Sequence, residues 1–225
     1  MAEEKSPVRN FLRNKSCSEM EISMNITVYL GAFEGNDKMI ADAVKELGAW
    51  IGESGNTLIY GGSKSGLMGL IADSVLNAGG EVIGVEPKFF VDEEIQHDGL
   101  TQLIVTNDMT ERKNKMIELG DVFIAFPGGT GTLEEIAEVM SKVSLKQMDT
   151  PCIIYNLNGY YDGLKMLLSH MIEMGLSTRE RQQGIYCVEN LQQIQEIVID
   201  RAESEGRFLN DSSKTYALGV TTGTL

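Results

Sequence analysis

Long apolar runs are missing from this sequence of 225 residues. No stretch approaches the roughly 20 consecutive apolar residues that a membrane-spanning helix needs. The first 25 residues also lack the apolar core of a secretory signal peptide. We therefore expect no membrane partner. A hydrophobic content of 42% with 23% charged residues predicts instead a globular chain, long enough for one sizeable domain with a full core.

Positive charge is scarce as well. The chain has 19 lysines and arginines against 33 aspartates and glutamates, which gives a net charge of −14. A nucleic-acid-binding protein needs a basic face that neutralises phosphates. The composition therefore argues against a nucleic-acid partner.

Cysteine is also rare. Cys17, Cys152 and Cys187 are widely spaced and odd in number, so they form neither a disulfide framework nor a zinc-binding pattern. We expect a reducing, cytoplasmic setting. The residues indicate no metal site and no bound cofactor.

From residue 25 to about residue 207, apolar runs alternate with helical patterns. Strands are expected at 25–30, 56–62, 81–85, 101–106, 122–126, 151–156 and 184–188; helices at 36–52, 65–80, 109–119, 132–146, 160–174 and 190–204; residues 86–99 look irregular. Continuous apolar strands separated by helices predict an α/β fold, a doubly wound Rossmann-like parallel sheet with helices on both faces. Residues 1–24 and 208–225 lack this alternation and are expected to be tails around a single domain, 25–207.

Three glycine-rich turns follow predicted strands, at residues 30–35, 60–69 and 127–132. None is a Walker A loop and none is a G-x-G-x-x-G fingerprint. The second and third can still present backbone N–H groups at helix N-termini, where phosphate binds readily. The alternative is that the glycines only allow tight packing between strand and helix.

Two glutamates follow the third turn, and an anion-binding loop has no obvious need for them. The segment from Thr132 to Glu135 fits a capping box, in which threonine caps the helix and glutamate bonds back to its N–H. That interpretation would explain Glu135 without any catalytic role.

A charged residue interrupts the apolar face of the preceding helix. Met109, Arg112, Met116 and Leu119 share one face at helical spacing. Burying a guanidinium is costly unless it meets an anion. Arg112 is therefore predicted to contact either a bound ligand or a carboxylate, and Glu135 is one candidate.

Three segments together resemble the LONELY GUY family of cytokinin-activating phosphoribohydrolases. They are PGGTGTLEE (127–135), ERKNKM (111–116) and GGSKSGLMG (61–69), and the resemblance covers about residues 25–190. It implies a Rossmann-like homodimer that hydrolyses the N-glycosidic bond of adenosine 5′-monophosphates, plain or N6-substituted. The products would be the free base, adenine or a cytokinin, and ribose 5-phosphate.

The resemblance also implies roles for individual residues. Arg112 and Glu135 match the catalytic pair of the family. Contacts to the nucleotide are expected from Lys113, Gly128, Gly129, Thr130, Gly131 and Thr132, and from Glu94, chosen from an acidic segment in the loop before the arginine helix. A carboxylate such as Glu135 would stabilise positive charge on the ribose and deprotonate the attacking water. Arg112 would orient the nucleotide or the glutamate.

Other interpretations remain open. Ser63 stands where relatives often have a third glycine, and we expect it beside the phosphate or ribose. Some relatives were labelled lysine decarboxylases, but no lysine is convincingly placed for a pyridoxal phosphate Schiff base. The chain could also be a non-catalytic nucleotide sensor, or a hydrolase of another nucleotide. Helices 109–119 and 132–146 are predicted to form the homodimer interface.

Overall fold

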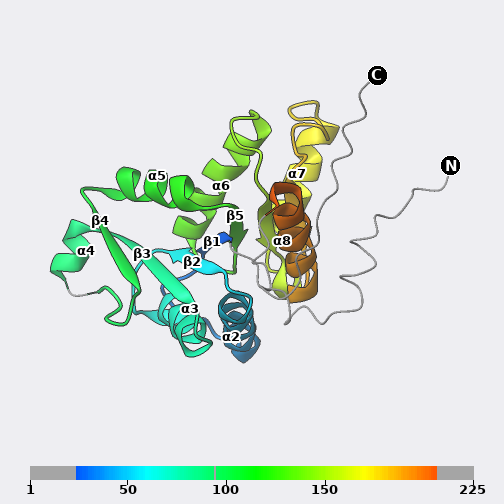
Figure 1. Ribbon diagram of the computed structural model, residues 1–225. Helices are drawn as coiled ribbons and strands as arrows, with labels where there is room; N and C mark the ends of the chain where they lie inside the picture. The colour runs from blue at the N-terminus through cyan, green and yellow to red at the C-terminus, as the bar shows by residue number, and fades with distance from the viewer. Residues whose placement is uncertain (1–23, 94, 207–225) are drawn as a thin grey trace, which may run out of the picture.

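A single sheet of seven parallel strands forms the centre of the computed structural model, which describes residues 24–93 and 95–206 (Figure 1). The strands lie in the order β4-β3-β2-β1-β5-β6-β7, and every pair is parallel. Their bounds are β1 (Asn25–Tyr29), β2 (Thr57–Tyr60), β3 (Glu81–Pro87), β4 (Gln102–Thr106), β5 (Val122–Ala125), β6 (Cys152–Tyr155) and β7 (Ile185–Val188).

Helices cover both faces of this sheet. On one face lie α2 (Lys38–Glu53), α3 (Gly66–Asn77) and α8 (Leu191–Glu205), and on the other lie α5 (Met109–Leu119), α6 (Thr130–Ser144) and α7 (Asp162–Glu173). A short helix, α4 (Lys88–Asp92), follows β3, and a 3₁₀ turn, η2 (Leu157–Gly159), follows β6. The predicted doubly wound α/β fold is confirmed.

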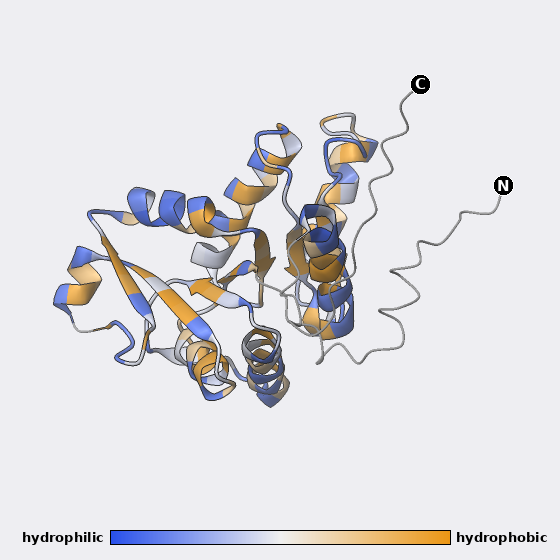
Figure 2. Ribbon diagram, in the orientation of Figure 1, coloured by the Kyte–Doolittle hydropathy of each residue, from blue (hydrophilic) through white to orange (hydrophobic). Residues whose placement is uncertain are grey.

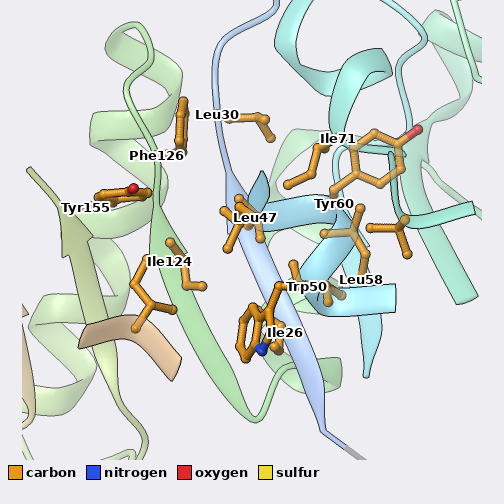
Figure 3. Packing of buried hydrophobic residues seen from close by; sticks show 14 of the residues in the cluster. Ile26, Leu30, Leu47, Trp50, Leu58, Tyr60, Ile71, Ile124, Phe126 and Tyr155 are labelled. Atoms are coloured by element: carbon orange, nitrogen blue, oxygen red, sulfur yellow. The ribbon is translucent and has the colours of Figure 1, made fainter. Parts of the chain in front are cut away.

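The burial pattern explains why these segments became strands. Every residue of β5 and β6 is buried, as expected for strands with a helical layer on each side. Ile26, Trp50, Leu58 and Ile124 belong to the core on the α2–α3 side (Figure 3). The helices turn apolar residues toward the sheet and hydrophilic ones outward (Figure 2).

Side-chain caps fix where several helices begin. The Asp108 carboxylate accepts a hydrogen bond from the Glu111 N–H (2.8 Å), and Glu111 in turn accepts one from the Asn107 N–H (2.8 Å). Asp37 caps α2 in the same way, and Asn190 caps α8. The reciprocal cap on α5 sets Arg112 one turn into that helix.

The strand order changes direction at β1: β2, β3 and β4 lie on one side of it, and β5, β6 and β7 lie on the other. This strand pairs with β2 on one side and with β5 on the other. The loop after β1 leads to α2 on one face, whereas the loop after β5 leads to α6 on the opposite face. Such a switch point opens a crevice beyond the carboxyl ends of the strands, where doubly wound proteins bind ligands.

Two of the predicted boundaries are wrong in ways that matter for the site. Strand β3 continues to Pro87 instead of ending at residue 85, and α6 begins at Thr130 instead of residue 132. Residues 86–99, expected to be irregular, contain α4. The predicted tails lie outside the described residues, except at Met24. Within the described part, no helix is both long and apolar enough to cross a bilayer.

Candidate active site

A pocket of about 440 Å³ opens at the switch point. Small-molecule sites commonly measure about 300–1,000 Å³, so its size suits a nucleotide. Its walls come from the loop after β1, the loop after β5, the first turns of α5 and α6, and Gly61 after β2. The pocket therefore lies mainly between the first and third glycine turns, and the second turn, 60–69, contributes Gly61, Leu67 and Met68.

The N-terminus of α6 faces this pocket without a side-chain cap. Gly129 is the N-cap residue, and no side chain bonds to the first turn from that position. The first intrahelical bond after the cap runs from the Leu133 N–H to the Gly129 carbonyl (3.1 Å). The N–H groups before Leu133 have no intrahelical acceptor, and together with the helix dipole they favour an anion.

The capping-box interpretation of Glu135 is wrong. Because α6 begins at Thr130, Thr132 is the third residue of the helix and Glu135 the sixth. A side chain six residues into a helix lies more than a turn beyond the reach of the N-cap N–H. Glycine at position 129 takes the extended backbone of an N-cap, so the helix starts earlier than the threonine pattern indicates.

The glycines of the third turn divide into two kinds. A methyl group added at Gly128 would overlap the Thr132 hydroxyl and lie 2.9 Å from the Gly31 nitrogen, so tight packing explains this glycine. A methyl group added at Gly129 or Gly131 would meet no described atom within 4 Å, and neither residue has a positive φ. The packing alternative therefore does not account for Gly129 and Gly131, whose Cα atoms border the pocket.

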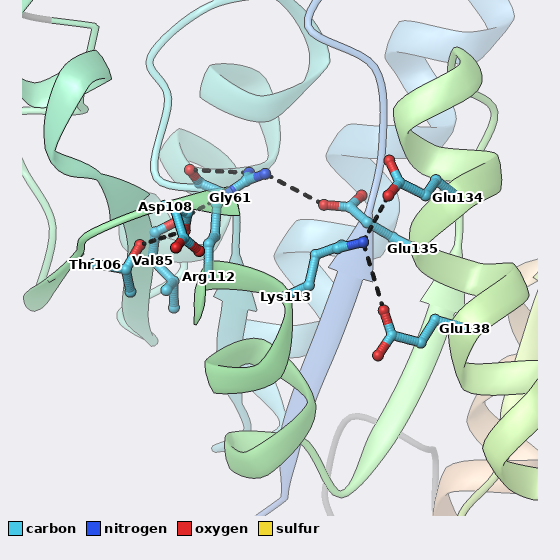
Figure 4. A network of polar contacts seen from close by, with 9 residues as sticks. All are labelled: Gly61, Val85, Thr106, Asp108, Arg112, Lys113, Glu134, Glu135 and Glu138. Atoms are coloured by element: carbon cyan, nitrogen blue, oxygen red, sulfur yellow. Dashed lines mark hydrogen bonds and ion pairs between the residues drawn. The ribbon is translucent and has the colours of Figure 1, made fainter. Parts of the chain in front are cut away.

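Arg112 reaches the pocket from α5 and is 8% exposed (Figure 4). Its Nε donates to the Val85 carbonyl oxygen (2.9 Å) and its Nη2 to the Gly61 carbonyl oxygen (3.3 Å). Its Nη1 donates to Oε1 of Glu135 at 3.3 Å. The predicted meeting of this guanidinium with a carboxylate is confirmed, and two strand ends fix its orientation.

Glu135 projects from α6 toward the same space with a side chain that is 11% exposed. Burial raises the pKa of this carboxyl to about 7, although the Arg112 charge opposes the rise and the Glu134 charge adds to it. A carboxylate with a pKa near neutrality is suited to accept a proton from water. The geometry thus supplies a potential general base beside an anion-binding helix end.

Lys113 also lines the pocket, but its ammonium group is turned toward α6. Its Nζ lies 2.6 Å from Oε1 of Glu134 and 3.6 Å from Oε2 of Glu138 (Figure 4). The hydrogen bond to Glu134 is the main reason why the pKa of Lys113 is raised. Lys113 is therefore a fully charged group at the rim of the site.

The predicted site residues come together, with one exception. The pocket is lined by Arg112, Lys113, Gly128, Gly129, Thr130, Gly131, Thr132 and Glu135. Glu94 lies outside the described residues. Ser63, expected beside the ligand, does not line this pocket: it is buried, and its hydroxyl accepts a hydrogen bond from the Ser65 N–H (3.1 Å).

Several lining residues were not predicted from the sequence. Tyr160 follows η2 and donates from its hydroxyl to the Gly128 carbonyl oxygen, which fastens the third glycine turn. Phe33 and Met109 add apolar surface at the wall. The glycines at 31 and 35 were a signal for the first turn, whereas nothing local marks Tyr160. No cluster of three potential metal ligands occurs among the described residues.

Comparison with known proteins identifies related sequences and solved structures of similar fold. A family model described as "Possible lysine decarboxylase" matches residues 68–198. A cytokinin riboside 5′-monophosphate phosphoribohydrolase of Rhodococcoides fascians is 41% identical over 165 residues, or 72% of this chain and 83% of that relative. One from Arabidopsis thaliana is 40% identical over 150 residues, or 67% of this chain and 70% of that relative.

Solved structures are similar at lower identity. The Moco carrier protein from Chlamydomonas reinhardtii has a TM-score of 0.61 at 20% identity, with 81% of this chain and 99% of that one covered. The molybdenum cofactor binding protein from Rippkaea orientalis has a TM-score of 0.57 at 22% identity, with 83% and 98% covered. These similarities concern the fold alone.

Proposed function

We propose, from the premise that this chain belongs to the LONELY GUY family of cytokinin riboside 5′-monophosphate phosphoribohydrolases, that it hydrolyses the N-glycosidic bond of adenosine 5′-monophosphate or its N6-substituted forms. The products are the free base and ribose 5-phosphate. Arg112 and Glu135 are the catalytic residues in this proposal. The substrate contacts come from Lys113, from the turn 128–132 and, outside the described residues, from Glu94.

One observation carries the proposal: a carboxylate with a raised pKa and an uncapped helix N-terminus face one nucleotide-sized pocket. The helix end attracts a phosphate. The carboxylate repels one, so it must serve another part of the ligand. Cleavage of an N-glycosidic bond builds positive charge on the ribose, and a nearby carboxylate stabilises that charge.

The residues divide the reaction between them. The N–H groups at the start of α6 hold the 5′-phosphate, and the missing side chains of Gly129 and Gly131 let it approach the backbone. Glu135 accepts a proton from the water that attacks the anomeric carbon, while the C–N bond breaks and its electron pair leaves with the base; the base then takes up a proton, from Glu135 or from solvent, to become the free base. Arg112, held by the Val85 and Gly61 carbonyls, orients Glu135 through its Nη1.

The lysine decarboxylase description of the family model has no support in the pocket chemistry. Among the described residues that line the pocket, Lys113 is the one lysine. A Schiff-base lysine needs a lowered pKa, whereas the pKa of Lys113 is raised by its bond to Glu134. We therefore assign Lys113 to charge complementarity with the nucleotide.

Base release tests the proposal directly. Purified protein is incubated with AMP, N6-isopentenyl-AMP and a guanine or pyrimidine 5′-monophosphate, and the free base is measured by chromatography. Release from either adenine nucleotide supports the proposal, and the ratio of the two rates identifies the preferred base. Release only from another nucleotide supports the second hydrolase interpretation. Tight binding without release of any base supports the sensor.

We further propose that the protein acts as a homodimer in the cytoplasm, through the outward faces of α5 and α6. Leu133 on α6 is 45% exposed, and Met109, at the pocket wall in the first turn of α5, is 38% exposed. Exposed large apolar side chains on adjacent helices suit a symmetric contact. Light scattering at micromolar concentration tests this assembly, and a monomeric mass would refute it.

A further inference from the structure

A second buried carboxylate lies behind the proposed catalytic pair. Glu86, the sixth residue of β3, is 1% exposed, and it does not line the pocket. Among the residues that the structure describes, none donates a hydrogen bond to its Oε2. A carboxylate oxygen without a donor at this depth is costly, since a buried charge requires a partner or a proton.

Glu86 is joined to Arg112 through both backbone anchors of the guanidinium. The Nε anchor is the Val85 carbonyl, which belongs to the peptide bond that links Val85 to Glu86. The Nη2 anchor is the Gly61 carbonyl, in the peptide bond that links Gly61 to Gly62.

The second of these peptides lies against the Glu86 side chain. Gly62 has a φ of +87°, and a methyl group added there would overlap the Glu86 carboxylate. A methyl group added at Gly61 would overlap Nη2 of Arg112. The Glu86 carboxylate and the Arg112 guanidinium therefore pack against two adjacent glycines. Since Val85 also precedes Glu86 in the chain, both carbonyl groups that hold Arg112 lie next to Glu86.

We propose that Glu86 is a positioning residue for Arg112. While the Glu86 carboxyl is neutral, the Arg112 guanidinium stays on Glu135; when the Glu86 carboxyl ionises, it attracts the guanidinium away from Glu135. The inference rests on the proposed function, because it assigns a role within the same site. The physical cause is charge: an ionised Glu86 has no described hydrogen-bond donor for Oε2, so Arg112 is the cation that can compensate it. One guanidinium then serves two carboxylates, and its bond to Glu135 weakens.

The charged surroundings of Glu86 are consistent with this role. Burial raises the pKa of Glu86 to about 7, against the opposing charge of Arg112 from α5. From β2, the Tyr60 hydroxyl donates to the Ser63 carbonyl oxygen, and the Glu86 charge helps to raise the pKa of Tyr60. Asp73 from α3 acts on Tyr60 as well and is bonded to His97 (3.0 Å). Arg112 is thus the permanently charged cation among these groups, and it can compensate the negative charge of an ionised Glu86.

Two measurements on Glu86→Gln test the inference. The first is the ¹⁵N–¹H signal of the Arg112 side-chain Nε–H, identified by its loss in Arg112→Lys and followed from pH 5.5 to 9. The second is kcat/KM for AMP over the same range, which reports ionisations of the free enzyme. Glu81→Gln is the matched control, because Glu81 is an exposed glutamate on the same strand.

The expected results depend on pH. Between pH 6 and pH 9 a group with a pKa near 7 passes from about one tenth ionised to almost fully ionised. The ratio of kcat/KM for Glu86→Gln to that for wild type should therefore rise about fivefold or more over this range. The ratio for Glu81→Gln should stay flat. The Arg112 signal should lose one titration step in Glu86→Gln and keep a step in Glu135→Gln.

Each outcome distinguishes this inference from the proposed function. An unchanged Arg112 titration and a flat activity ratio in Glu86→Gln would overturn the role of Glu86 while base release stands. A lost titration step in a protein that releases no base would support Glu86 and reject the hydrolase. If Glu86→Gln does not fold, Glu135→Gln still decides, because an Arg112 signal that no longer titrates there would contradict the inference.

Discussion

Replacing Glu135 by glutamine separates catalysis from a structural ion pair with Arg112. Glutamine keeps the size and the hydrogen-bonding oxygen of the side chain but removes its negative charge and its basicity. If Glu135 is the general base, hydrolysis should fall by about 10²- to 10⁴-fold, the usual contribution of such a group. Nucleotide affinity should survive, because in the proposed binding mode the phosphate is held by N–H groups of α6 that the substitution leaves in place.

Stability should respond in the direction opposite to that of a structural ion pair. Burial raises the pKa of Glu135 from 4.5 to about 7 in the folded protein, net of the help from Arg112. The folded state therefore binds the proton more tightly than the unfolded state does. The contribution of Glu135 to stability is then greatest below pH 4.5 and falls as the pH rises through about 7, by at most about 3 kcal/mol at 1.36 kcal/mol per pKa unit.

Glutamine has no such cost, because it never ionises. The free energy of unfolding of Glu135→Gln, relative to that of wild type, should increase by up to about 3 kcal/mol between pH 5 and pH 8, so that the variant gains stability as the pH rises. Urea unfolding at the two pH values measures this difference. Glu118→Gln is the control, since Glu118 is an exposed glutamate of α5 paired with Lys115. A less stable Glu135→Gln at pH 8 with near-normal hydrolysis would refute the reasoning and make Glu135 a structural partner of Arg112.

Three further predictions follow from the same geometry. Arg112→Lys keeps the positive charge but loses the fixed donors to the Val85 and Gly61 carbonyls, so kcat/KM should fall about 10²-fold through misplacement; steady-state kinetics would show this, and a near-normal value would contradict it. Gly131→Ala should keep the melting temperature and weaken AMP binding at least about tenfold in calorimetry. Gly128→Ala should instead lower the melting temperature, because overpacking there costs about 1–3 kcal/mol. Equal effects of the two substitutions would refute the distinction between these glycines. Leu133→Glu should shift the protein from dimer to monomer in light scattering, and an unchanged mass would exclude this face of α6 as the interface.

The fold was predictable because its signals are local. Each strand is a short apolar run followed by turn residues, and each long helix repeats its apolar positions at helical spacing. The position of Arg112 was predictable for the same reason. A guanidinium on the apolar face of a helix needs an anion wherever the helix docks, and Glu135 is that anion.

The start of α6 was not predictable from the same kind of signal. The sequence offers Thr132 and Glu135 at capping-box spacing, and a search for side-chain caps selects them. The helix instead begins after Gly129, whose cap involves only backbone conformation. Tyr160 was missed because its hydrogen bond to Gly128 joins residues 32 apart in the chain, and the local sequence around neither residue indicates this contact.

Glu86 was not predictable because its burial is a property of the sheet. A glutamate after an apolar strand, next to a proline, is typical of a strand end in solvent. Pairing with β4 carries β3 two residues further, with Glu86 opposite Val105 and Pro87 opposite Thr106. The side chain is then enclosed between its strand and Gly62.

The two buried carboxylates bear on whether the pocket binds or also transforms its ligand. A protein that only holds a nucleotide gains from the N–H groups of α6 and from Lys113, but Glu135 and Glu86 oppose a phosphate anion and cost stability at neutral pH. The presence of Glu135, the one of the two that lines the pocket, is explained if the ligand becomes cationic while it is bound. The ribose does so as its bond to the base breaks, and a carboxylate beside it then stabilises the transition state more than the bound substrate. Hydrolysis thus accounts for Glu135, whereas binding alone does not.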